Sequence, residues 1–392
     1  MARSGDRRYG PMTELVLGGR DSDEQFGFVN PPVVHGSTVL WSTVADFKAA
    51  RGRYTYGRRG TPTSEALSDA LKLIEGGQYV ALAPSGVTAV ALALMTALKA
   101  GDHLLMVDTV YDPTRRFCDG MLRRMGVETS YYDPSVGAHV SDLMRPNTKA
   151  VFVESPGSLT FEVQDVPAIA GAAHARGAAV IMDNTWATPL FFKAHDHGVD
   201  LAVSAGTKYL GGHADLMMGW VSANAAHAAA LRATHGALGL CCGPDDMFLA
   251  LRGLRTLGVR LAHHQAAGLR VARWLQSRPE VARVMHPGLE SDPGHALWKR
   301  DFTGASGLFA IELKPGTEAG LAAFLDELEL FGLGYSWGGF ESLAIPFDAR
   351  PMRTASKWAP QGPTIRLHIG LEDVEDLVAD LDAGLARYAA VG

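Results

Sequence analysis

A single lysine stands out in the segment SAGTKYLGGH, residues 204–213, because Lys208 lies among small and apolar residues with no acidic neighbour. An ammonium group that loses water in such a setting has a lowered pKa, and its neutral amine can attack a carbonyl carbon. The three glycines of this segment could equally make it an ordinary surface turn. The segment alone leaves both interpretations open, and other residues have to decide between them.

Two other positions carry groups that a carbonyl cofactor bound to a lysine would need. Asp183 ends the apolar run AAVIMD, where a carboxylate is costly unless a cation or hydrogen bonds compensate it. A buried ion pair or a helix cap would explain it structurally, and pairing with a protonated ring nitrogen would explain it functionally. Gly86, in the turn PSGVTAV, opens a helix-like run whose N-terminal N–H groups suit a phosphate. A phosphate site, an acid for a pyridinium and a desolvated lysine, in this order, predict pyridoxal 5'-phosphate (PLP).

Three further side chains suit a cofactor ring or an amino-acid substrate. Tyr111 follows another apolar run, and it either stacks on the ring or is a half-buried tyrosine. Arg366 alternates with apolar residues in TIRLHIG, which is typical of a solvated strand face, although its planar guanidinium also suits an α-carboxylate. Trp337, between serine and glycine in YSWGGFES, either walls a pocket or fills the core.

The apolar runs that carry these residues alternate with helical patterns, which predicts a mostly parallel sheet covered on both faces. The first helix begins with Thr61 as N-cap and Pro62 in the first turn, and it ends at the two glycines 76–77. Strands are expected at 103–108, 127–133, 149–156, 178–184 and 200–206, and helices at 115–126 and 166–177. Ligands bind at the carboxyl ends of strands in such sheets, so Asp183 and Lys208 fall on one edge.

The pattern changes along the chain and predicts three parts. Residues 1–60 form an irregular arm, residues 61–245 a large α/β domain, and residues 246–392 a smaller α+β domain with a partly antiparallel sheet. A long helical stretch at 245–279 leads into shorter strands, expected at 281–287, 307–313, 341–347 and 364–370.

Composition argues against several classes of function. The chain has 392 residues, 47% hydrophobic and 20% charged, as is usual for a globular protein of two domains. A formal charge of −6, with no Lys or Arg run longer than a pair, argues against a nucleic-acid partner. No uncharged apolar segment could span a bilayer, and the N-terminus lacks the apolar core of a signal peptide. Neither the three cysteines nor the 14 histidines show metal-ligand spacing. We therefore expect a cytoplasmic protein with no metal, nucleic-acid or membrane partner.

Five motifs, taken together, resemble the Cys/Met-metabolism PLP-dependent enzymes of fold type I. They are YGRRGTPT, VIMDNTWATP, SAGTKYLGGHAD, YSWGGFESL and TIRLHIGLED, and the resemblance extends from about residue 15 to about residue 388. It implies a PLP-binding large domain with a mostly parallel seven-stranded sheet, and a smaller C-terminal α+β domain. It also implies a homotetramer whose active sites are shared between subunits.

The resemblance implies a role for each residue that matches a motif. Lys208 would bind the PLP aldehyde and act in catalysis with Tyr111, which would also stack on the ring, and Asp183 would hold the ring nitrogen. The implied phosphate contacts are Gly86, Val87, Ser204, Thr207 and, from a neighbouring subunit, Tyr56 and Arg58. The implied contacts to the amino-acid thioether substrate are Ser336, Trp337 and Arg366.

The implied reaction is β-elimination of L-cystathionine to homocysteine, pyruvate and ammonia, as in methionine biosynthesis. Trp337 and the motif VDTVYDPTRRFC favour this branch of the family over the γ-acting relatives, which share the PLP contacts. The alternatives are a broader C–S lyase and a non-catalytic PLP-binding regulator, and the intact lysine, acid and carboxylate clamp disfavour the regulator. The chain departs from the family at Ala205, where many relatives have serine, and over 235–247, so the range of thioether substrates stays open.

Overall fold

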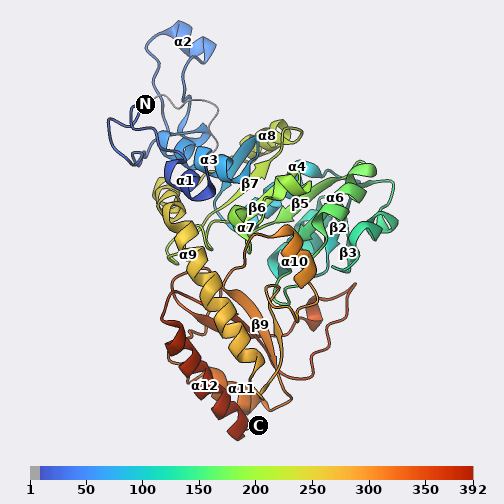
Figure 1. Ribbon diagram of the computed structural model, residues 1–392. Coiled ribbons are helices and arrows are strands. Elements are labelled where there is room, and N and C mark those ends of the chain that lie inside the picture. The colour runs from blue at the N-terminus through green and yellow to red at the C-terminus, as the bar shows by residue number, and fades with distance from the viewer. Residues whose placement is uncertain (1–8, 392) are drawn as a thin grey trace.

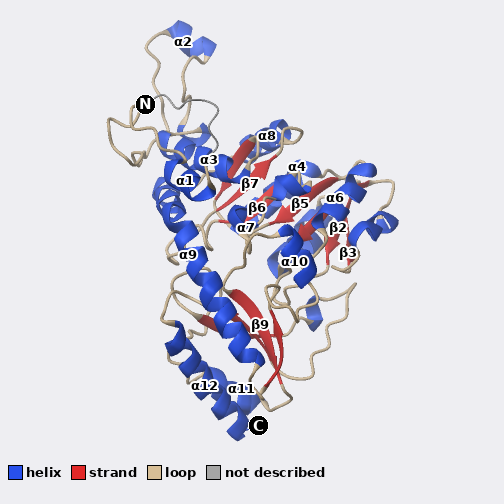
Figure 2. Ribbon diagram, viewed as in Figure 1, coloured by secondary structure: helices blue, strands red, loops and turns tan. Residues whose placement is uncertain are grey.

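Two sheets joined by a long helix, α9 (Pro244–Gln276), make up most of the protein (Figure 1). The computed structural model describes residues 9–391. We call the seven-stranded sheet and its helices the large domain, and the four-stranded sheet and its helices the small domain (Figure 2). The expected boundaries after residues 60 and 245 stay predictions, and the first eight residues of the expected arm lie outside the described residues.

The large sheet has the strand order β1-β7-β6-β5-β4-β2-β3. Its strands are β1 (Tyr79–Ala83), β2 (His103–Val107), β3 (Glu128–Tyr132), β4 (Thr148–Glu154), β5 (Ala179–Asp183), β6 (Leu201–Ala205) and β7 (Gly219–Ala223). The pairs among β2 to β6 are parallel, while β7 runs antiparallel to both β1 and β6. The seven-stranded, mostly parallel sheet expected from the resemblance is thus confirmed.

Helices cover both faces of this sheet. They are α3 (Pro62–Glu75), α4 (Gly86–Ala97), α5 (Asp112–Phe117), α6 (Val166–Ala175), α7 (Thr188–Phe191) and α8 (Ala228–Leu238). Shorter turns of 3-10 helix lie at Gly57–Arg59, Gly137–Leu143 and Ala194–His197, and a π-helical turn at Cys118–Leu122 extends α5. Neighbouring residues of β1 show that both faces are buried, because Ala81 packs with the cluster around α4 and Leu82 with the cluster around α3.

Two helix starts follow the sequence signals closely. In α3, the Thr61 side chain accepts the N–H of Ser64, the Ser64 hydroxyl accepts the N–H of Thr61, and Pro62 occupies the first turn. This reciprocal pair satisfies two N–H groups that the helix leaves open. In α4, Ser85 is the N-cap and its hydroxyl accepts the N–H of Thr88 at 3.1 Å. The predicted start of α3 at Thr61 is confirmed.

The small sheet has the order β10-β11-β9-β8, and each of its strand pairs is antiparallel. Its strands are β8 (Val281–Met285), β9 (Leu308–Leu313), β10 (Leu343–Phe347) and β11 (Thr364–His368). The helices of this part are α10 (His295–Asp301), α11 (Glu318–Leu325) and α12 (Val374–Val391), with a 3-10 turn at Arg350–Met352. The partly antiparallel sheet expected from sequence is antiparallel in every pair of named strands.

The helix α9 contributes to the cores of both domains. Its first half places Leu254 and Leu257 in the cluster with α3, β1 and β7. Its second half places Val271 and Leu275 in the cluster with the small sheet, α11 and α12. In Figure 1, α9 runs from beside α3 down to the small domain.

The arm carries α1 (Pro11–Leu17) and α2 (Val44–Ala49), and α2 projects away from both sheets at the top of Figure 1. Leu15 anchors α1 in the cluster with α3 and α9. Large apolar side chains farther along the arm are exposed; among them, Phe26 is 87% exposed and Leu40 is 88% exposed. Large contiguous patches of exposed apolar side chains often mark a surface that contacts another protein.

Candidate active site

A cavity of about 170 Å³ lies at the carboxyl ends of β4, β5 and β6, where the N-terminus of α4 and the small domain meet. Ligands of open α/β sheets bind at this edge. Eight of the residues expected to form the site line the cavity: Gly86, Val87, Tyr111, Asp183, Thr207, Lys208, Trp337 and Arg366. The two of these residues that are farthest apart in the sequence, Gly86 and Arg366, are separated by 280 positions, and the fold brings them to one place.

Lys208 follows β6 and directs its amine toward the small domain. Its Nζ donates a hydrogen bond to Ser336 Oγ at 2.7 Å and lies 5.2 Å from the centre of the Trp337 ring. Burial, together with the nearby positive charge of Arg366, lowers the pKa of Lys208 to about 8, while Asp183 opposes the shift. An amine with this pKa is partly neutral near physiological pH, as nucleophilic or basic chemistry requires.

A pair of carboxyl groups ends the adjacent strands β4 and β5. Glu154 lies directly beside Asp183 in the register of the two strands. Burial raises the pKa of Asp183, although hydrogen bonds from Thr185, including its N–H at 2.9 Å, and the charge of Lys208 oppose the shift. Burial and the charge of Asp183 also raise the pKa of Glu154 well above its ordinary value. A protonated ring nitrogen would supply the positive charge that this buried pair calls for.

The first turn of α4 forms a cradle of backbone N–H groups at the cavity. Gly86 packs so closely on Ala205 of β6 that a Cβ at position 86 would lie 2.7 Å from the Ala205 Cβ. The N–H groups of Gly86 and Val87 belong to the first turn of the helix, where no intrahelical carbonyl is available to them. Because the helix dipole also favours an anion here, the cradle suits the phosphate of PLP. Thr207 lines the same cavity and could add a hydroxyl.

Tyr111 is the N-cap residue of α5, at the end of the loop that follows β2. Its backbone N–H donates to Glu154 Oε2 at 2.8 Å, which fixes the loop against β4. Burial raises the pKa of Tyr111, and the nearby carboxylates Glu154 and Asp183 raise it further. The hydroxyl is therefore protonated at neutral pH.

The small domain contributes the residues opposite Lys208. Arg366 lies in β11 and donates through a terminal nitrogen to the backbone oxygen of Ser336 at 2.8 Å. Burial lowers the pKa of Arg366 to about 10, which leaves it a cation. Ser336 has a φ of +81°, a backbone conformation that residues other than glycine adopt only with strain. The turn that begins at Ser336 packs closely against the backbone of Lys208, because a Cβ at Gly338 would be 2.9 Å from the carbonyl carbon of Lys208.

Four expected site residues lie outside the cavity lining. Ser204 lines a separate small cavity with Tyr209 and Trp220, and its buried Oγ has no hydrogen-bond partner among the described residues. Tyr56 and Arg58 line a different cavity, next to α3 and α8, where Arg58 donates to the backbone oxygen of Gly236 at 3.1 Å. Tyr56 and Arg58 therefore do not line the cavity that contains Lys208 of the same chain. Ser336 joins the site through Lys208, although it is not part of the lining.

Sequence reasoning missed Glu154, Ser85 and Thr185, which also line the cavity. Glu154 ends an apolar run in the way that Asp183 does, so the same signal could have identified it. Thr185 accepts the N–H of Ala205 at 3.0 Å and so ties the loop after β5 to the end of β6. No pattern in the sequence marks a threonine for that role.

The structure also bears on two other classes of site. Among residues 9–391, no cluster of three or more His, Cys, Asp or Glu side chains could hold a metal ion. Within the same residues, no helix is both long and apolar enough to cross a membrane.

Comparison with known proteins identifies the family. The family model of Cys/Met metabolism PLP-dependent enzymes matches residues 12–386. The cystathionine β-lyase of Salmonella typhimurium is 46% identical over 386 residues, covering 96% of this chain and 98% of its own, and that of Escherichia coli is 45% identical over 386 residues, with the same coverage. The crystal structure of cystathionine γ-synthase from Xanthomonas oryzae pv. oryzae in complex with cystathionine superimposes with a TM-score of 0.91 at 34% identity, covering 98% of this chain and all of that chain. The fold class expected from sequence is confirmed, and the chain belongs to the Cys/Met metabolism family of PLP-dependent enzymes.

Proposed function

We propose that this protein is a carbon–sulfur lyase that cleaves L-cystathionine by β-elimination, giving homocysteine, pyruvate and ammonia. The observation that carries the proposal is the arrangement around Lys208, whose buried amine shares one cavity with Asp183 and Arg366. The names of the relatives from Salmonella and Escherichia, at 46% and 45% identity, support the choice of reaction.

The residues of the cavity fit PLP in three places. Gly86 and Val87 would hold the phosphate through the first turn of α4, Asp183 would pair with the ring nitrogen, and Lys208 would bind the aldehyde carbon. Tyr111 would stack on the ring from the large domain. When bound, PLP supplies an electron-withdrawing ring that stabilises negative charge developing at the substrate Cα.

The chain's own residues would move the protons. The Lys208 amine, with its pKa lowered to about 8, is a suitable base for the Cα proton, and Ser336 Oγ at 2.7 Å orients it. The leaving sulfur takes up a proton from Lys208 or from the protonated hydroxyl of Tyr111. Trp337, which lines the cavity beside Lys208, limits the space around the substrate and keeps water away from the amine.

Arg366 would bind the substrate α-carboxylate. Its guanidinium is a buried cation, and its Nε has no hydrogen-bond partner among the described residues. A planar carboxylate can accept two parallel hydrogen bonds from such a group. Ser336, whose backbone oxygen already orients Arg366, would lie beside the same carboxylate.

The proposal includes an assembly with shared active sites, a homotetramer in which Tyr56 and Arg58 reach the phosphate of a neighbouring subunit. The position of both residues outside their own cavity and the exposed apolar side chains of the arm support it. We also propose that the enzyme acts in the cytoplasm, in methionine biosynthesis. The three cysteines of the chain are unpaired thiols, as is common in a reducing compartment.

The first test is to incubate PLP-loaded protein with L-cystathionine and identify both products. Pyruvate with homocysteine would establish β-elimination. 2-Oxobutyrate with cysteine would instead establish γ-cleavage, which the superposition on a γ-synthase keeps as the second candidate. No turnover of cystathionine, with other thioethers cleaved, would indicate a C–S lyase that prefers another thioether.

Lys208→Ala should abolish turnover and the visible absorbance of the bound cofactor, because no other lysine is among the described residues that line the cavity. Lys149→Ala, at an exposed position on β4, is the matched control and should leave both unchanged. An active Lys208→Ala variant would refute the assignment.

Arg366→Ala should mainly raise KM for amino-acid substrates.

A further inference from the structure

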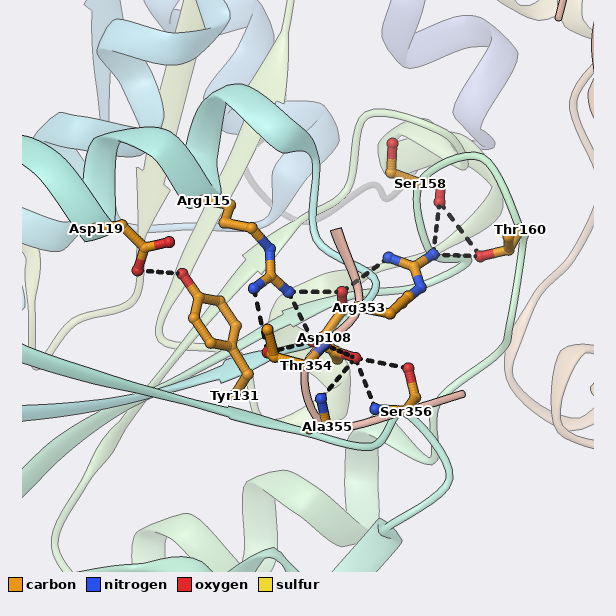
Figure 3. Close-up of polar contacts among 10 residues, drawn as sticks. All are labelled: Asp108, Arg115, Asp119, Tyr131, Ser158, Thr160, Arg353, Thr354, Ala355 and Ser356. Atoms are coloured by element: carbon orange, nitrogen blue, oxygen red, sulfur yellow. Dashed lines mark hydrogen bonds and ion pairs between the residues drawn. The ribbon is translucent and has the colours of Figure 1, made fainter. Parts of the chain in front are cut away.

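A buried carboxylate of the large domain holds a loop of the small domain (Figure 3). Asp108 follows β2 and is fully buried. Its two carboxylate oxygens accept the N–H groups of Thr354, Ala355 and Ser356 at 2.7–3.1 Å. They also accept the hydroxyls of Thr354 at 3.0 Å and Ser356 at 2.7 Å. Successive N–H groups that converge in this way form an anion-binding nest, and here the anion is a side chain of the other domain.

The charge of Asp108 is compensated on its own domain. Arg115 of α5 donates to Asp108 Oδ1 at 2.7 Å and stacks on the Tyr131 ring, with its guanidinium carbon 3.6 Å from the ring centre. The Tyr131 hydroxyl donates in turn to Asp119 at 2.8 Å. Burial alone would raise the pKa of Asp108, but the hydrogen bonds from Ser356, Thr354 and Arg115 outweigh it and lower the pKa to about 2. Asp108 is therefore an anion across the physiological pH range.

The residue just before the nest makes a second tie to the large domain. Arg353 donates to the backbone oxygen of Asp108 at 2.8 Å and to Thr160 Oγ1 at 2.7 Å. Thr160 belongs to the loop after β4, which also lines the cavity through Ser158 and Phe161. The segment 353–356 is thus held to the ends of two strands of the large sheet.

These ties connect the two halves of the active site. On the large-domain side, Asp108 lies three residues before Tyr111 in the loop that leads into α5. On the small-domain side, the segment 353–356 leads into β11, which carries Arg366. Asp108 itself is not part of the cavity lining. Its contacts join the domain that carries Arg366 to the domain that carries Tyr111 and Lys208.

We propose that Asp108 is a positioning residue that fixes the 353–356 segment of the small domain against the large domain, and so sets the place of Arg366 relative to Lys208. The role of Arg366 in carboxylate binding rests on the proposed function, whereas the attachment of the segment does not. A small displacement of a substrate-binding group is enough to change turnover or binding strongly.

Asp108→Asn is the variant that tests this role. The amide keeps the shape of the carboxylate, but its NH2 group is a donor where N–H and O–H donors converge, and it leaves Arg115 without a counter-charge. We expect the amides of residues 354–356 to exchange hydrogen at least about tenfold faster, while peptides from β5 and β6 keep their protection. We also expect KM for the amino-acid substrate to rise about tenfold or more with a smaller change in kcat. The visible absorbance of bound PLP should persist, because Asp108 is not part of the cavity lining.

Two further variants make the test decisive. Asp142→Asn makes the same substitution at an exposed position and should change neither exchange nor KM. Thr354→Val combined with Ser356→Ala removes both hydroxyl donors from the small-domain side without touching the core of the large domain, and it should raise KM by a smaller factor. This variant replaces Asp108→Asn if that protein does not fold.

Several results would overturn the proposal. Unchanged exchange at 354–356 in Asp108→Asn would show that the carboxylate does not hold the segment. Faster exchange with unchanged KM would show that the segment does not position Arg366, and loss of PLP absorbance would indicate a role in cofactor binding instead. If the unmodified enzyme does not cleave cystathionine, the proposed function fails, and the exchange measurement still tests the attachment of the segment.

Discussion

At the scale of single residues, the lysine amine is the group whose chemistry depends most on its surroundings. Lys208 is surrounded by protein on most sides, and its neighbours include one cation, Arg366, and one buried acid, Asp183. Burial and the cation both disfavour the ammonium form, and the acid favours it. The net effect is a pKa of about 8, well below the ordinary 10.5.

This pKa predicts the reactivity of the cofactor-free protein toward an amine reagent. Only the neutral amine reacts, so labelling of Lys208 by trinitrobenzenesulfonate should reach half its maximum near pH 8, whereas exposed lysines should require pH above about 10. Arg366→Gln removes the nearby cation and should move the midpoint of Lys208 upward, while Arg366→Lys keeps the charge and serves as control. Peptide mapping after labelling at several pH values measures each lysine separately. A midpoint of Lys208 at the pH of exposed lysines would contradict the prediction.

At the scale of elements, α3 ends in a buried acid. Glu75 is 1% exposed and accepts the indole N–H of Trp220 from β7 at 2.7 Å. A negative charge at the C-terminus of a helix is unfavourable to the helix dipole. Burial raises the pKa of Glu75 to about 7, although the hydrogen bond from Trp220 and the charge of Lys193 oppose the shift. The contact of α3 with the sheet is thus best satisfied when Glu75 is neutral.

Glu75 should therefore make the stability of the protein depend on pH. Between 4.5, the ordinary pKa of a glutamate, and about 7, the folded chain keeps a proton that the unfolded chain releases. Stability from this group is fully present below that interval, decreases as the pH rises through it, and is reduced by up to about 3 kcal/mol above it.

Glu75→Gln accepts the same indole hydrogen bond without titrating, so it should be more stable than the original protein at pH 8 and similar to it at pH 5. Urea unfolding of both proteins at the two pH values measures the difference, and all other titrating groups cancel in the comparison. An equal pH dependence in both proteins would show that Glu75 ionises freely in the folded state.

The elements of the fold were predictable where the local pattern was strong. The runs that became β2, β4, β5 and β6 are nearly continuous in apolar residues, and the start of α3 carries a cap and a proline. The strands β1 and β7 were missed, because β1 merges in sequence with the turn before α4 and the five residues of β7 follow a glycine-rich loop. Their pairing with each other is set by tertiary contacts between segments about 140 residues apart in the chain.

The site was predictable to a similar extent. Lys208, Asp183 and Arg366 could be found because charged groups at the ends or in the middle of apolar runs need an explanation. The contacts that orient them could not be found, since the hydrogen bond from Lys208 to Ser336 and the nest around Asp108 join segments more than 120 residues apart. Local sequence carries no information about which loops of two domains meet.

At the scale of the whole molecule, the cavity alone does not contain all the residues expected to hold the phosphate. Tyr56 and Arg58 lie with the arm, next to α3 and α8. If a neighbouring subunit supplies them, a dimer of one Arg58-defective and one Lys208-defective subunit has both defects in the same site, and its other site is intact.

Mixing the two defective proteins should therefore restore activity. Arg58→Ala and Lys208→Ala subunits, unfolded together and refolded at equal amounts, should form mixed dimers in which one of two sites has both native residues. Random pairing makes about half of the dimers mixed, so the mixture should recover about a quarter of the original activity. Each variant refolded alone is the control, and no recovery in the mixture would show that both residues serve one site of the same chain.

The continuous helix α9 has a consequence for how the chain comes apart. Its 33 residues span about 50 Å, and its two halves are buried in different cores. Loss of either core would expose half of the helix and remove the surface on which the other core packs, so we expect the two domains to unfold as one cooperative unit. A chain cut within α9 would leave two fragments, each with an incomplete hydrophobic surface that only the other fragment can cover.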